Sequence, residues 1–288
     1  MIDKCRLCST DLIHDGFFCN DKPDVEVGHC LKCKAVQLFE NAENIEEIYK
    51  SINNLPEDFE VERKRQENWN RKRIELVRRY IPGAGKLNLL DFGSGTGGFL
   101  EKAQKNFKSV VGYDISPEVC GLHDRSGWRC VSDLRSIDAK SIGIITLFHV
   151  LEHLPRPWEI LKDIKGKFKN IEYFVIEVPN TDEALLSVFN MQKYRNNHYS
   201  SQHIWYFTEK SLGAVLKKAG LTVVVSTQLQ RYSLLNNVGW MIDHRVEPGE
   251  YDFIFGDRKM DGIYEKALIK NRIADSIFVV CRRGKREK

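Results

Sequence analysis

The residues that most directly indicate chemistry lie between positions 89 and 97, where the sequence is Leu-Leu-Asp-Phe-Gly-Ser-Gly-Thr-Gly. The three glycines allow a tight backbone turn whose N–H groups are not covered by side chains. The apolar run before this loop predicts a buried strand, and the pattern from Phe99 onward predicts a helix. Because a helix begins where the loop ends, the positive end of its dipole would face a ligand there. The stretch therefore predicts a site for a ligand with an anionic end.

This loop matches two known fingerprints. Gly93, Gly95 and Gly98 satisfy G-x-G-x-x-G, the dinucleotide pattern, which is a weak signal by itself. The spacing of Asp91 from the glycines, which continue to Gly97, resembles motif I of the class I S-adenosylmethionine (SAM) methyltransferases. A carboxylate at this position can hold the cationic amino group of methionine, whereas it would repel a pyrophosphate. The resemblance therefore implies SAM as the cofactor of this loop.

The elements after the loop follow the order of a doubly wound α/β sheet. A strand from Ser109 ends at Asp114, where a carboxylate should meet the ribose hydroxyls of the cofactor. A third strand ends at Asp133, which resembles the family residue near the adenine amino group. Ser116 and Thr208 are predicted to cap the helices that follow them. Further strands are predicted at 142–148, 173–178 and 221–226, and an antiparallel last strand at 276–281. The expected fold is α/β, a Rossmann-like class I methyltransferase sheet preceded by a small zinc ribbon.

A histidine-containing stretch, His149-Val-Leu-Glu-His153-Leu-Pro, follows the strand predicted at 142–148. It would lie at the carboxyl edge of the sheet, where such folds bind their ligands, and it resembles the H-x-x-E-H-x-x-x-P stretch of many small-molecule methyltransferases. If the stretch were helical, His149 and His153 would share a face and could bind a metal ion. The helix-borne zinc motif has the different order H-E-x-x-H, which disfavours that interpretation. The Asn/Asp-Pro-Pro-aromatic word of enzymes that methylate amino groups of nucleic-acid bases or glutamine is absent, which excludes that class.

Four of the eight cysteines form two CxxC pairs, Cys5/Cys8 and Cys30/Cys33, near the spacing of a zinc ribbon. Two such turns can complete a tetrahedron of thiolates, and a closed four-cysteine site is structural rather than catalytic. A disulfide pairing is the alternative interpretation. Other possible ligands are His14, Cys19 and His29. The remaining cysteines, predicted to be core thiols, are Cys120, Cys130 and Cys281.

Composition limits the location and partners of the chain. No signal peptide precedes Cys5 and no run of 18 apolar residues occurs, so we expect no membrane span and a reducing, cytoplasmic location. The formal net charge of +4 is small for the strongly basic domain that a nucleic-acid partner requires. Residues 60–80 carry eight Arg or Lys against four Glu. This pattern indicates either a solvated helix face or a surface that steers an anionic substrate.

The segments around the paired cysteines carry a second resemblance. Cys5-Arg-Leu-Cys8-Ser and His29-Cys-Leu-Lys-Cys33-Lys-Ala-Val-Gln-Leu are similar to the zinc-binding module of bacterial sugar C-methyltransferases. Those enzymes build branched deoxysugars on nucleotide carriers. The similarity runs from this module to about residue 230 and does not include the long carboxyl-terminal domain of those enzymes.

The catalytic segment of the sugar enzymes, Glu-His-Leu-x-Tyr-Phe, corresponds here to Gln202-His203-Ile-Trp-Tyr-Phe. The histidine and the Tyr-Phe pair match, whereas Gln202 replaces the glutamate. O-methyltransferases of surface-polysaccharide clusters carry a similar His-x-x-x-Phe word. The resemblance implies methylation, on oxygen rather than carbon, of a nucleotide-linked or phosphorylated sugar. It makes His203 the first candidate for the general base, with His149 and His153 next, and the aromatic residues after His203 would exclude water around a small acceptor.

These observations together predict a SAM-dependent methyltransferase. The methyl group is an electrophile on its sulfonium, so the enzyme must align a nucleophile opposite the sulfur and remove its proton. Histidine suits that base because its ordinary pKa lies near neutral pH. His149 is also a candidate cofactor contact. The alternatives are a ribosomal-RNA methyltransferase with a zinc module, an NAD(P)-binding oxidoreductase and a non-catalytic assembly partner.

Four regions are predicted along the chain. They are a zinc-ribbon module at 1–40, a helical linker at 41–81, the SAM-binding domain at 82–230, and 231–288, a lid or dimerisation insertion with the final strand. The apolar stripes of the linker are formed by Ile45, Ile48, Tyr49, Ile52, Trp69, Leu76, Val77 and Tyr80. Residues 231–275 show no regular pattern. Their large apolar side chains, suited to a lid or a homodimer surface, include Trp240, Met241, Tyr251 and Phe253.

Overall fold

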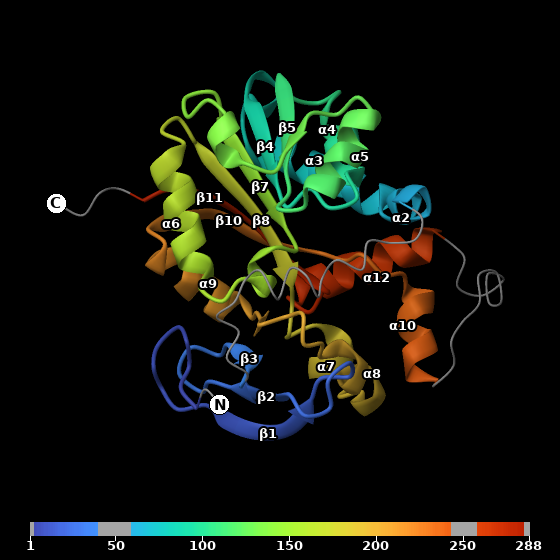
Figure 1. Cartoon of the computed structure of the whole chain (residues 1–288). Helices are drawn as coiled ribbons and strands as arrows, with labels where there is room; N and C mark the ends of the chain where they lie inside the picture. Colours follow the sequence, from blue (N-terminus) through green and yellow to red (C-terminus); the bar gives the residue numbers. More distant parts are fainter. Residues whose placement is uncertain (1–2, 40–58, 243–257, 285–288) are drawn as a thin grey trace.

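A seven-stranded mixed sheet forms the centre of the structure, a computed structural model that describes residues 3–39, 59–242 and 258–284 (Figure 1). The strand order is β10-β11-β8-β7-β4-β5-β6. The strands that pair in parallel are β4 (Asn88–Phe92), β5 (Ser109–Tyr113), β6 (Cys130–Val131), β7 (Ile144–Phe148) and β8 (Tyr173–Pro179). β11 (Ser276–Arg283) runs antiparallel between β8 and β10 (Leu221–Leu229). The predicted α/β fold with an antiparallel last strand is confirmed.

Helices cover both faces of this sheet. β7 and β8 are buried along their whole length, as parallel strands covered on both faces must be. On one face, Leu90 and Ile145 belong to a core shared with α6 (Pro157–Lys167) and α9 (Glu209–Lys218). On the other face, the neighbouring Leu89 and Ile144 pack with α3 (Glu67–Tyr80) and α4 (Gly98–Ala103). Because successive strand residues point to opposite faces, the apolar runs in the sequence supply both cores.

Both predicted helix caps are confirmed. Ser116 Oγ accepts a hydrogen bond from the N–H of Val119 at the start of α5 (Pro117–Arg125). Thr208 forms a capping box with Ser211 at the start of α9. These caps orient the helices on either side of the site described below.

The other helices lie outside the central pattern. They are α2 (Phe59–Arg65), α7 (Ala184–Ser187), α8 (Gln192–His198), α10 (Leu234–Met241), α12 (Arg258–Lys270) and three 3-10 turns (Ala84–Lys86, Leu134–Ser136, Leu151–His153). Two helices, α10 and α12, lie within 231–275, where the sequence shows no regular pattern. Asn237 donates a hydrogen bond to the hydroxyl of Tyr264, which joins these two helices. The predicted stripe at 45–52, and also Tyr251 and Phe253, lie outside the described residues. None of the described helices has the length and apolarity needed to span a membrane.

A second sheet joins the N-terminal region to a distant segment. β1 (Ile13–Phe18), β2 (Glu26–His29) and β3 (Val36–Leu38) form an antiparallel series, and β9 (Trp205–Tyr206) pairs with β3. Figure 1 shows this small sheet beneath the carboxyl ends of the large one. Trp205 packs in the core that also contains Cys33 and Phe39. The N-terminal module therefore contacts the loop that carries His203.

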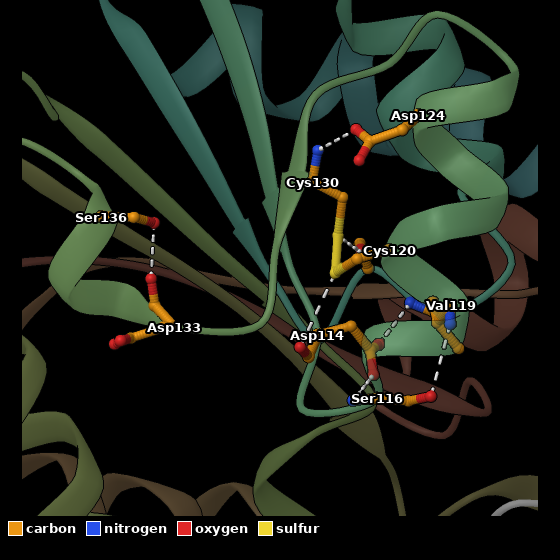
Figure 2. Close-up of a disulfide and its surroundings, with 10 residues drawn as sticks. Asp114, Ser116, Val119, Cys120, Asp124, Cys130, Asp133 and Ser136 are labelled. Carbon is orange, nitrogen blue, oxygen red and sulfur yellow. Dashed lines mark hydrogen bonds between the residues drawn. A yellow bond between two sulfur atoms is a disulfide. The ribbon is translucent and has the colours of Figure 1, made fainter.

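Two of the predicted core thiols are joined. Figure 2 shows Cys120 of α5 and Cys130 of β6 as a disulfide, close to Asp114. The prediction of free thiols was wrong for this pair, because residues on separate elements are brought within a Cα–Cα distance of 4.8 Å by the packing of α5 on the sheet. Cys281 is a buried free thiol, as expected.

Candidate active site and cysteine cluster

The glycine loop connects β4 to α4. Gly93, Gly95 and Gly97 have positive φ angles of 80°, 48° and 79°, a region that residues with a Cβ rarely adopt. A Cβ on Gly93 would lie 2.6 Å from Cγ2 of Val150, so packing also requires glycine there. Nothing lies within 4 Å of the place where a Cβ on Gly95 would be. A ligand can therefore approach the backbone at Gly95.

Two carboxylates flank this loop. Asp114, just after β5, accepts hydrogen bonds from the N–H groups of Gly95 (3.0 Å) and Ser116 (3.1 Å). Asp91 is buried within β4 and accepts a hydrogen bond from Thr146 Oγ1 at 2.7 Å. Burial raises the pKa of Asp91 to about 7, and the hydrogen bond from Thr146 only partly opposes this. A cationic ligand beside Asp91 would therefore stabilise its ionised form, which burial disfavours.

Asp133 follows β6 and is more exposed. It accepts a hydrogen bond from the backbone N–H of Arg135 at 2.8 Å. It also forms an ion pair with the Arg135 side chain, at 2.9 Å from Nε. The backbone hydrogen bond and the Arg135 charge lower the pKa of Asp133. Asp91, Asp114 and Asp133 thus lie along three adjacent strands, in the order predicted.

A cleft of about 630 Å³ lies at the carboxyl edge of the sheet. The predicted site residues that line it are Asp91, Gly93, Gly95, His149, His153 and His203. The predicted residues outside its lining are Gly97, Asp114 and Asp133. The structure therefore places all three base candidates in the same cleft as the glycine loop, although His203 is distant in sequence.

His149 follows β7 with a positive φ of 55°. Its Nδ1 lies 3.1 Å from Oε1 of Glu152, and its Nε2 lies 2.9 Å from Oε1 of Glu177. Nη1 of Arg231 lies 3.2 Å from the same Nε2. Protein groups thus engage both ring nitrogens, which leaves His149 less available to a substrate than the other two histidines.

A buried ion pair supports His149. Arg73 of α3 binds Glu177 of β8 through two N–O contacts of 2.7 and 2.9 Å. Burial opposes ionisation of Glu177, but the Arg73 charge and the His149 hydrogen bond outweigh it and lower the pKa of Glu177. The sequence analysis missed this pair. The available signal was one glutamate within the otherwise apolar run of β8, since a buried charge needs a partner.

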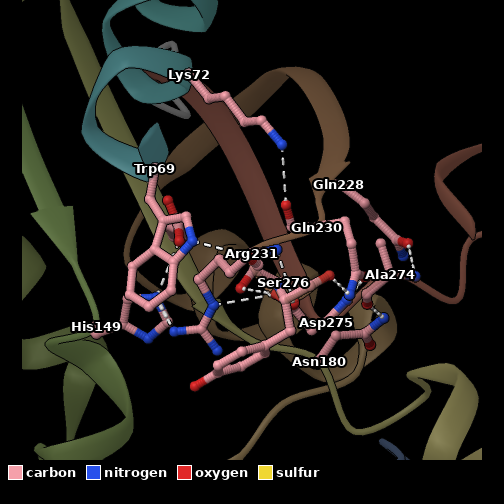
Figure 3. A network of polar contacts seen from close by, with 12 residues as sticks. Trp69, Lys72, His149, Asn180, Gln228, Gln230, Arg231, Ala274, Asp275 and Ser276 are labelled. Carbon is pink, nitrogen blue, oxygen red and sulfur yellow. Dashed lines mark hydrogen bonds and ion pairs between the residues drawn. The ribbon is translucent and has the colours of Figure 1, made fainter. Parts of the chain in front are cut away.

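A polar network connects α3, His149 and the ends of β10 and β11 (Figure 3). Arg231 binds the carboxylate of Asp275 through its backbone N–H and its Nε, at 2.7 and 3.0 Å. Trp69 donates its ring N–H to the carbonyl of Arg231 at 2.7 Å. Lys72 contacts the carbonyl of Gln230 at 3.2 Å. This network was also missed, because its members come from segments with no shared motif.

His153 and His203 form an edge-to-face pair with ring centroids 4.8 Å apart. Nδ1 of His153 lies 2.8 Å from the carbonyl oxygen of Gln202. Burial, followed by the His153 charge, lowers the pKa of His203 to about 3, so the ring of His203 is neutral at physiological pH. Within the described part of the chain, no hydrogen bond joins either ring nitrogen of His203 to another group. Both rings line the cleft with nitrogens available to a ligand.

The aromatic wall of the cleft differs from the expectation. Trp205, Tyr206 and Phe207 are at most 1% exposed and lie outside the cleft lining, so the expectation that they would surround the acceptor was wrong. Pairing of β9 with β3 holds these side chains in two cores instead. The cleft is lined by Trp69 and Tyr232, whose rings meet edge to face at 5.7 Å.

The four paired cysteines converge at the N-terminal sheet. Their sulfur atoms all lie within 4.8 Å of one another, and the Cys5–Cys33 and Cys8–Cys30 sulfurs are each 3.5 Å apart. Thiolates bound to one tetrahedral Zn²⁺ at ~2.3 Å are about 3.8 Å apart, so this geometry fits zinc. All four are free thiols rather than the alternative disulfides. The other possible ligands, His14, Cys19 and His29, are not part of the cluster.

The family follows from sequence comparison. A family model described as a methyltransferase domain matches residues 61–226, more than half of the chain. The chain belongs to this family. It is a SAM-dependent methyltransferase, and this finding decides against the NAD(P)-binding oxidoreductase alternative. No curated protein matches the sequence.

Solved structures of other methyltransferases are similar to this chain. A SAM-dependent methyltransferase from Archaeoglobus fulgidus is 21% identical, with 74% of this chain and 94% of that chain covered and a TM-score of 0.48. The mitomycin 7-O-methyltransferase is 15% identical, with coverage of 82% and 60% and a TM-score of 0.50. At such identities the likeness concerns the fold alone.

The residues present fit the SAM that the family implies. The open space at Gly95 would accommodate the cofactor beside bare backbone. Asp91 lines the cleft and would meet the ammonium group, and Asp114, beside Gly95, would meet ribose hydroxyls. When bound, SAM supplies a methyl group on a positively charged sulfur. The chain contributes the cleft that holds this group opposite an acceptor.

Proposed function

We propose that this methyltransferase methylates a hydroxyl group of a small sugar that is phosphorylated or nucleotide-linked. The observation that carries the proposal is the composition of one cleft, whose lining includes the glycine loop, here called the cofactor end, and the His153–His203 pair, here called the acceptor end. Arg65 and Arg231 flank the ring of Trp69, with guanidinium carbons 5.8 and 5.6 Å from its centroid. Flat aromatic faces suit sugar rings, and arginines suit phosphate oxygens.

The cationic helices favour a small acceptor over RNA. Arg71 pairs with Glu67 and Lys72 with Glu265, both at 2.7 Å, while Arg73 is held by Glu177. The Arg71 pair is the i,i+4 contact expected of a solvated helix face, whereas the Lys72 pair joins α3 to α12 and the Arg73 pair is buried. A surface that binds an RNA backbone needs cations available to several phosphates. Arg65 and Arg231 are also paired, with Glu62 and Asp275, but they differ in lining the cleft together, which suits one anionic group.

In the proposed reaction, the chain aligns the acceptor hydroxyl with the methyl group and removes its proton. His203 is the first candidate to receive this proton, since its ring is neutral, lines the cleft and has no hydrogen-bond partner among the described residues. Because its pKa is lowered to about 3, it is a weak base that accepts the proton only as the O–CH3 bond forms and the hydroxyl becomes strongly acidic. His153 is the second candidate through its Nε2. His149, with both nitrogens engaged, orients Glu152 and Glu177.

Methyl transfer to a panel of acceptors tests this proposal. We expect nucleotide sugars or sugar phosphates to gain one methyl group by mass spectrometry, with the same sugars lacking phosphate as matched controls. An enzyme that methylated ribosomal RNA and none of the sugars would contradict the proposal.

We also propose that Cys5, Cys8, Cys30 and Cys33 hold one structural Zn²⁺. Elemental analysis of a Cys30→Ser/Cys33→Ser variant should show one zinc per chain fewer than the parent, together with lower thermal stability. The buried Cys281→Ser is the control and should keep the parental zinc content. Equal zinc in the cluster variant and the parent would contradict the assignment.

A further inference from the structure

Three side chains with metal-ligand chemistry meet at the acceptor end of the cleft. Glu152, His153 and His203 each offer one ligand atom, and these atoms all lie within 4.8 Å of one another. Zinc–nitrogen and zinc–oxygen bonds of ~2.0–2.2 Å place tetrahedral ligand atoms about 3.4 Å apart. Small side-chain rotations would bring the three ligand atoms to this separation. Two imidazoles and one carboxylate suit Zn²⁺ and other first-row divalent cations. We propose that these three residues bind a divalent cation of this class, separate from the cysteine cluster.

The surroundings of the triad orient it for a cation. His153 donates from Nδ1 to the carbonyl of Gln202 at 2.8 Å, so the lone pair is on Nε2. Histidines that bind metals characteristically use the other ring nitrogen for such a bond. His149 contacts Oε1 of Glu152 at 3.1 Å and fixes this carboxylate in turn. The order H-x-x-E-H disfavours a metal site formed by His149 and His153. It instead lets His149 bind Glu152 and hold the carboxylate in place.

A second observation points independently to a ligand. Glu152 is fully buried, and its Oε2 has no hydrogen-bond partner among the described residues. A buried carboxylate oxygen without a partner carries a large free-energy cost. The same carboxylate lies beside two imidazoles that have nitrogens available. A bound cation would satisfy this oxygen and use the lone pairs of both rings.

The triad also leaves room for substrate. Three protein ligands leave at least one coordination position, and both histidines of the triad line the cleft that contains the glycine loop. The role of the cation rests on the proposed function. With the cation bound, the lone pairs of His153 and His203 are used as ligands, so the cation replaces these rings as the group that acts on the acceptor. It would hold the acceptor hydroxyl and promote loss of the hydroxyl proton to water. The oxygen lone pair then forms the O–CH3 bond while the C–S bond of SAM breaks and its electron pair stays on sulfur.

Titration of Zn²⁺ into the zinc-loaded full chain tests the site by isothermal calorimetry. We expect one binding event beyond the cysteine cluster, weakened at least about tenfold in His203→Ala and in Glu152→Gln. Glu159→Gln, which changes an exposed glutamate of α6, is the matched control and should bind Zn²⁺ as the parent does. Because Glu152→Gln removes a buried charge, circular dichroism should first establish that this variant is folded. His203→Ala is the second variant because it changes a side chain that lines the cleft rather than a buried charge.

Co²⁺ gives a second readout that does not depend on activity. Co²⁺ bound by the triad should show absorption without the intense sulfur-to-cobalt bands of the cysteine cluster. The absence of a second binding event, or one that His203→Ala leaves unchanged, would overturn the metal site. If the cation binds and no sugar is methylated, the proposed function fails while the site stands. If sugars are methylated at the same rate with or without the second cation, the function stands and the role of the cation in it is overturned.

Discussion

At the cofactor end of the cleft, Asp91, Gly93 and Gly95 come from one continuous segment, the end of β4 and the loop after it, whereas the acceptor end takes His153 and His203 from two segments distant in sequence. Backbone conformation shapes the first end, since the glycines must adopt positive φ angles. Tertiary contacts shape the second, because His203 immediately precedes the residues that join β9 to the N-terminal sheet. We therefore expect variants of the first end to act locally on SAM, and variants of the second to act on turnover or on the fold.

The largest effect is expected at the acceptor end, from His203→Ala. Turnover should fall about 10²–10⁴-fold, because the acceptor loses the group that receives or directs its proton. SAM affinity should remain within about twofold of the parent. Single-turnover methyl transfer and calorimetry measure the two quantities, and the exposed His14→Ala is the control. If His203→Ala lost SAM binding together with turnover, the assignment of SAM binding and turnover to different ends of the cleft would be wrong.

The buried Arg73–Glu177 ion pair, which supports His149, should be critical for stability. Arg73→Met leaves the charge of Glu177 buried without its partner, so the free energy of unfolding should fall by about 3–5 kcal/mol. Arg71→Met, which breaks the exposed pair on the same helix, should stay close to the parent. Urea unfolding measures both variants.

The pH dependence of this stability has a defined sign. The folded-state pKa of Glu177 is lowered, so its contribution is present above the ordinary glutamate pKa of about 4.3 and is lost as the pH falls through the folded value. Acid should therefore destabilise the parent more steeply than Arg73→Met. Equal acid sensitivity of the two proteins would contradict this account.

At the cofactor end, Asp114→Ala should weaken SAM binding at least tenfold. Charge-assisted hydrogen bonds to ribose are worth about 1.5–3 kcal/mol each. Calorimetry should show Asp138→Ala, another loop aspartate, to bind SAM as the parent does. Parental affinity in folded Asp114→Ala would disprove the ribose contact.

A matched pair of glycines separates contact with SAM from backbone strain. Gly95 and Gly127 both have positive φ and open space around the Cβ position, but only Gly95 lines the cleft. Substitution by Ala should cost each variant about 1–2 kcal/mol of folding free energy. Only Gly95→Ala should weaken SAM binding, by several-fold in a calorimetric titration. Equal SAM affinity in both variants would place the cofactor elsewhere.

The smallest expected effect is a pH dependence of SAM affinity. The pKa of Asp91 is raised to about 7, so its carboxyl becomes negative as the pH rises through neutrality. Affinity for the SAM ammonium should then rise about threefold between pH 6.5 and 7.5, as the ionised fraction of a group of pKa about 7 rises from about a quarter to about three quarters. Asp91→Asn should remove this dependence. A flat profile in the parent would show that Asp91 does not meet the ammonium group.

Patterns within single segments predicted much of the fold. The strand–loop–helix at the glycine loop, the caps at Ser116 and Thr208 and the position of the last strand follow from local propensity and periodicity. The antiparallel direction of that strand was implied by the family resemblance. The helices α10 and α12 were missed because they lie outside the alternating strand–helix order and pack on each other, through contacts such as Asn237–Tyr264. The Cys120–Cys130 pairing was missed for a similar reason, since each cysteine fits its own element equally well as a thiol.

The sequence by itself determined the methyltransferase sheet, the glycine loop and the two CxxC pairs, because each depends on residue types at short, regular spacings. Only the tertiary structure decided that Arg73 faces Glu177, that β9 completes the N-terminal sheet and that Glu152, His153 and His203 converge. Glu152 and His153 are neighbours in sequence, yet nothing in their segment indicates that His203 will lie beside them. Contacts between distant segments depend on how the whole core packs, and that information is spread over many apolar residues rather than written in any one motif.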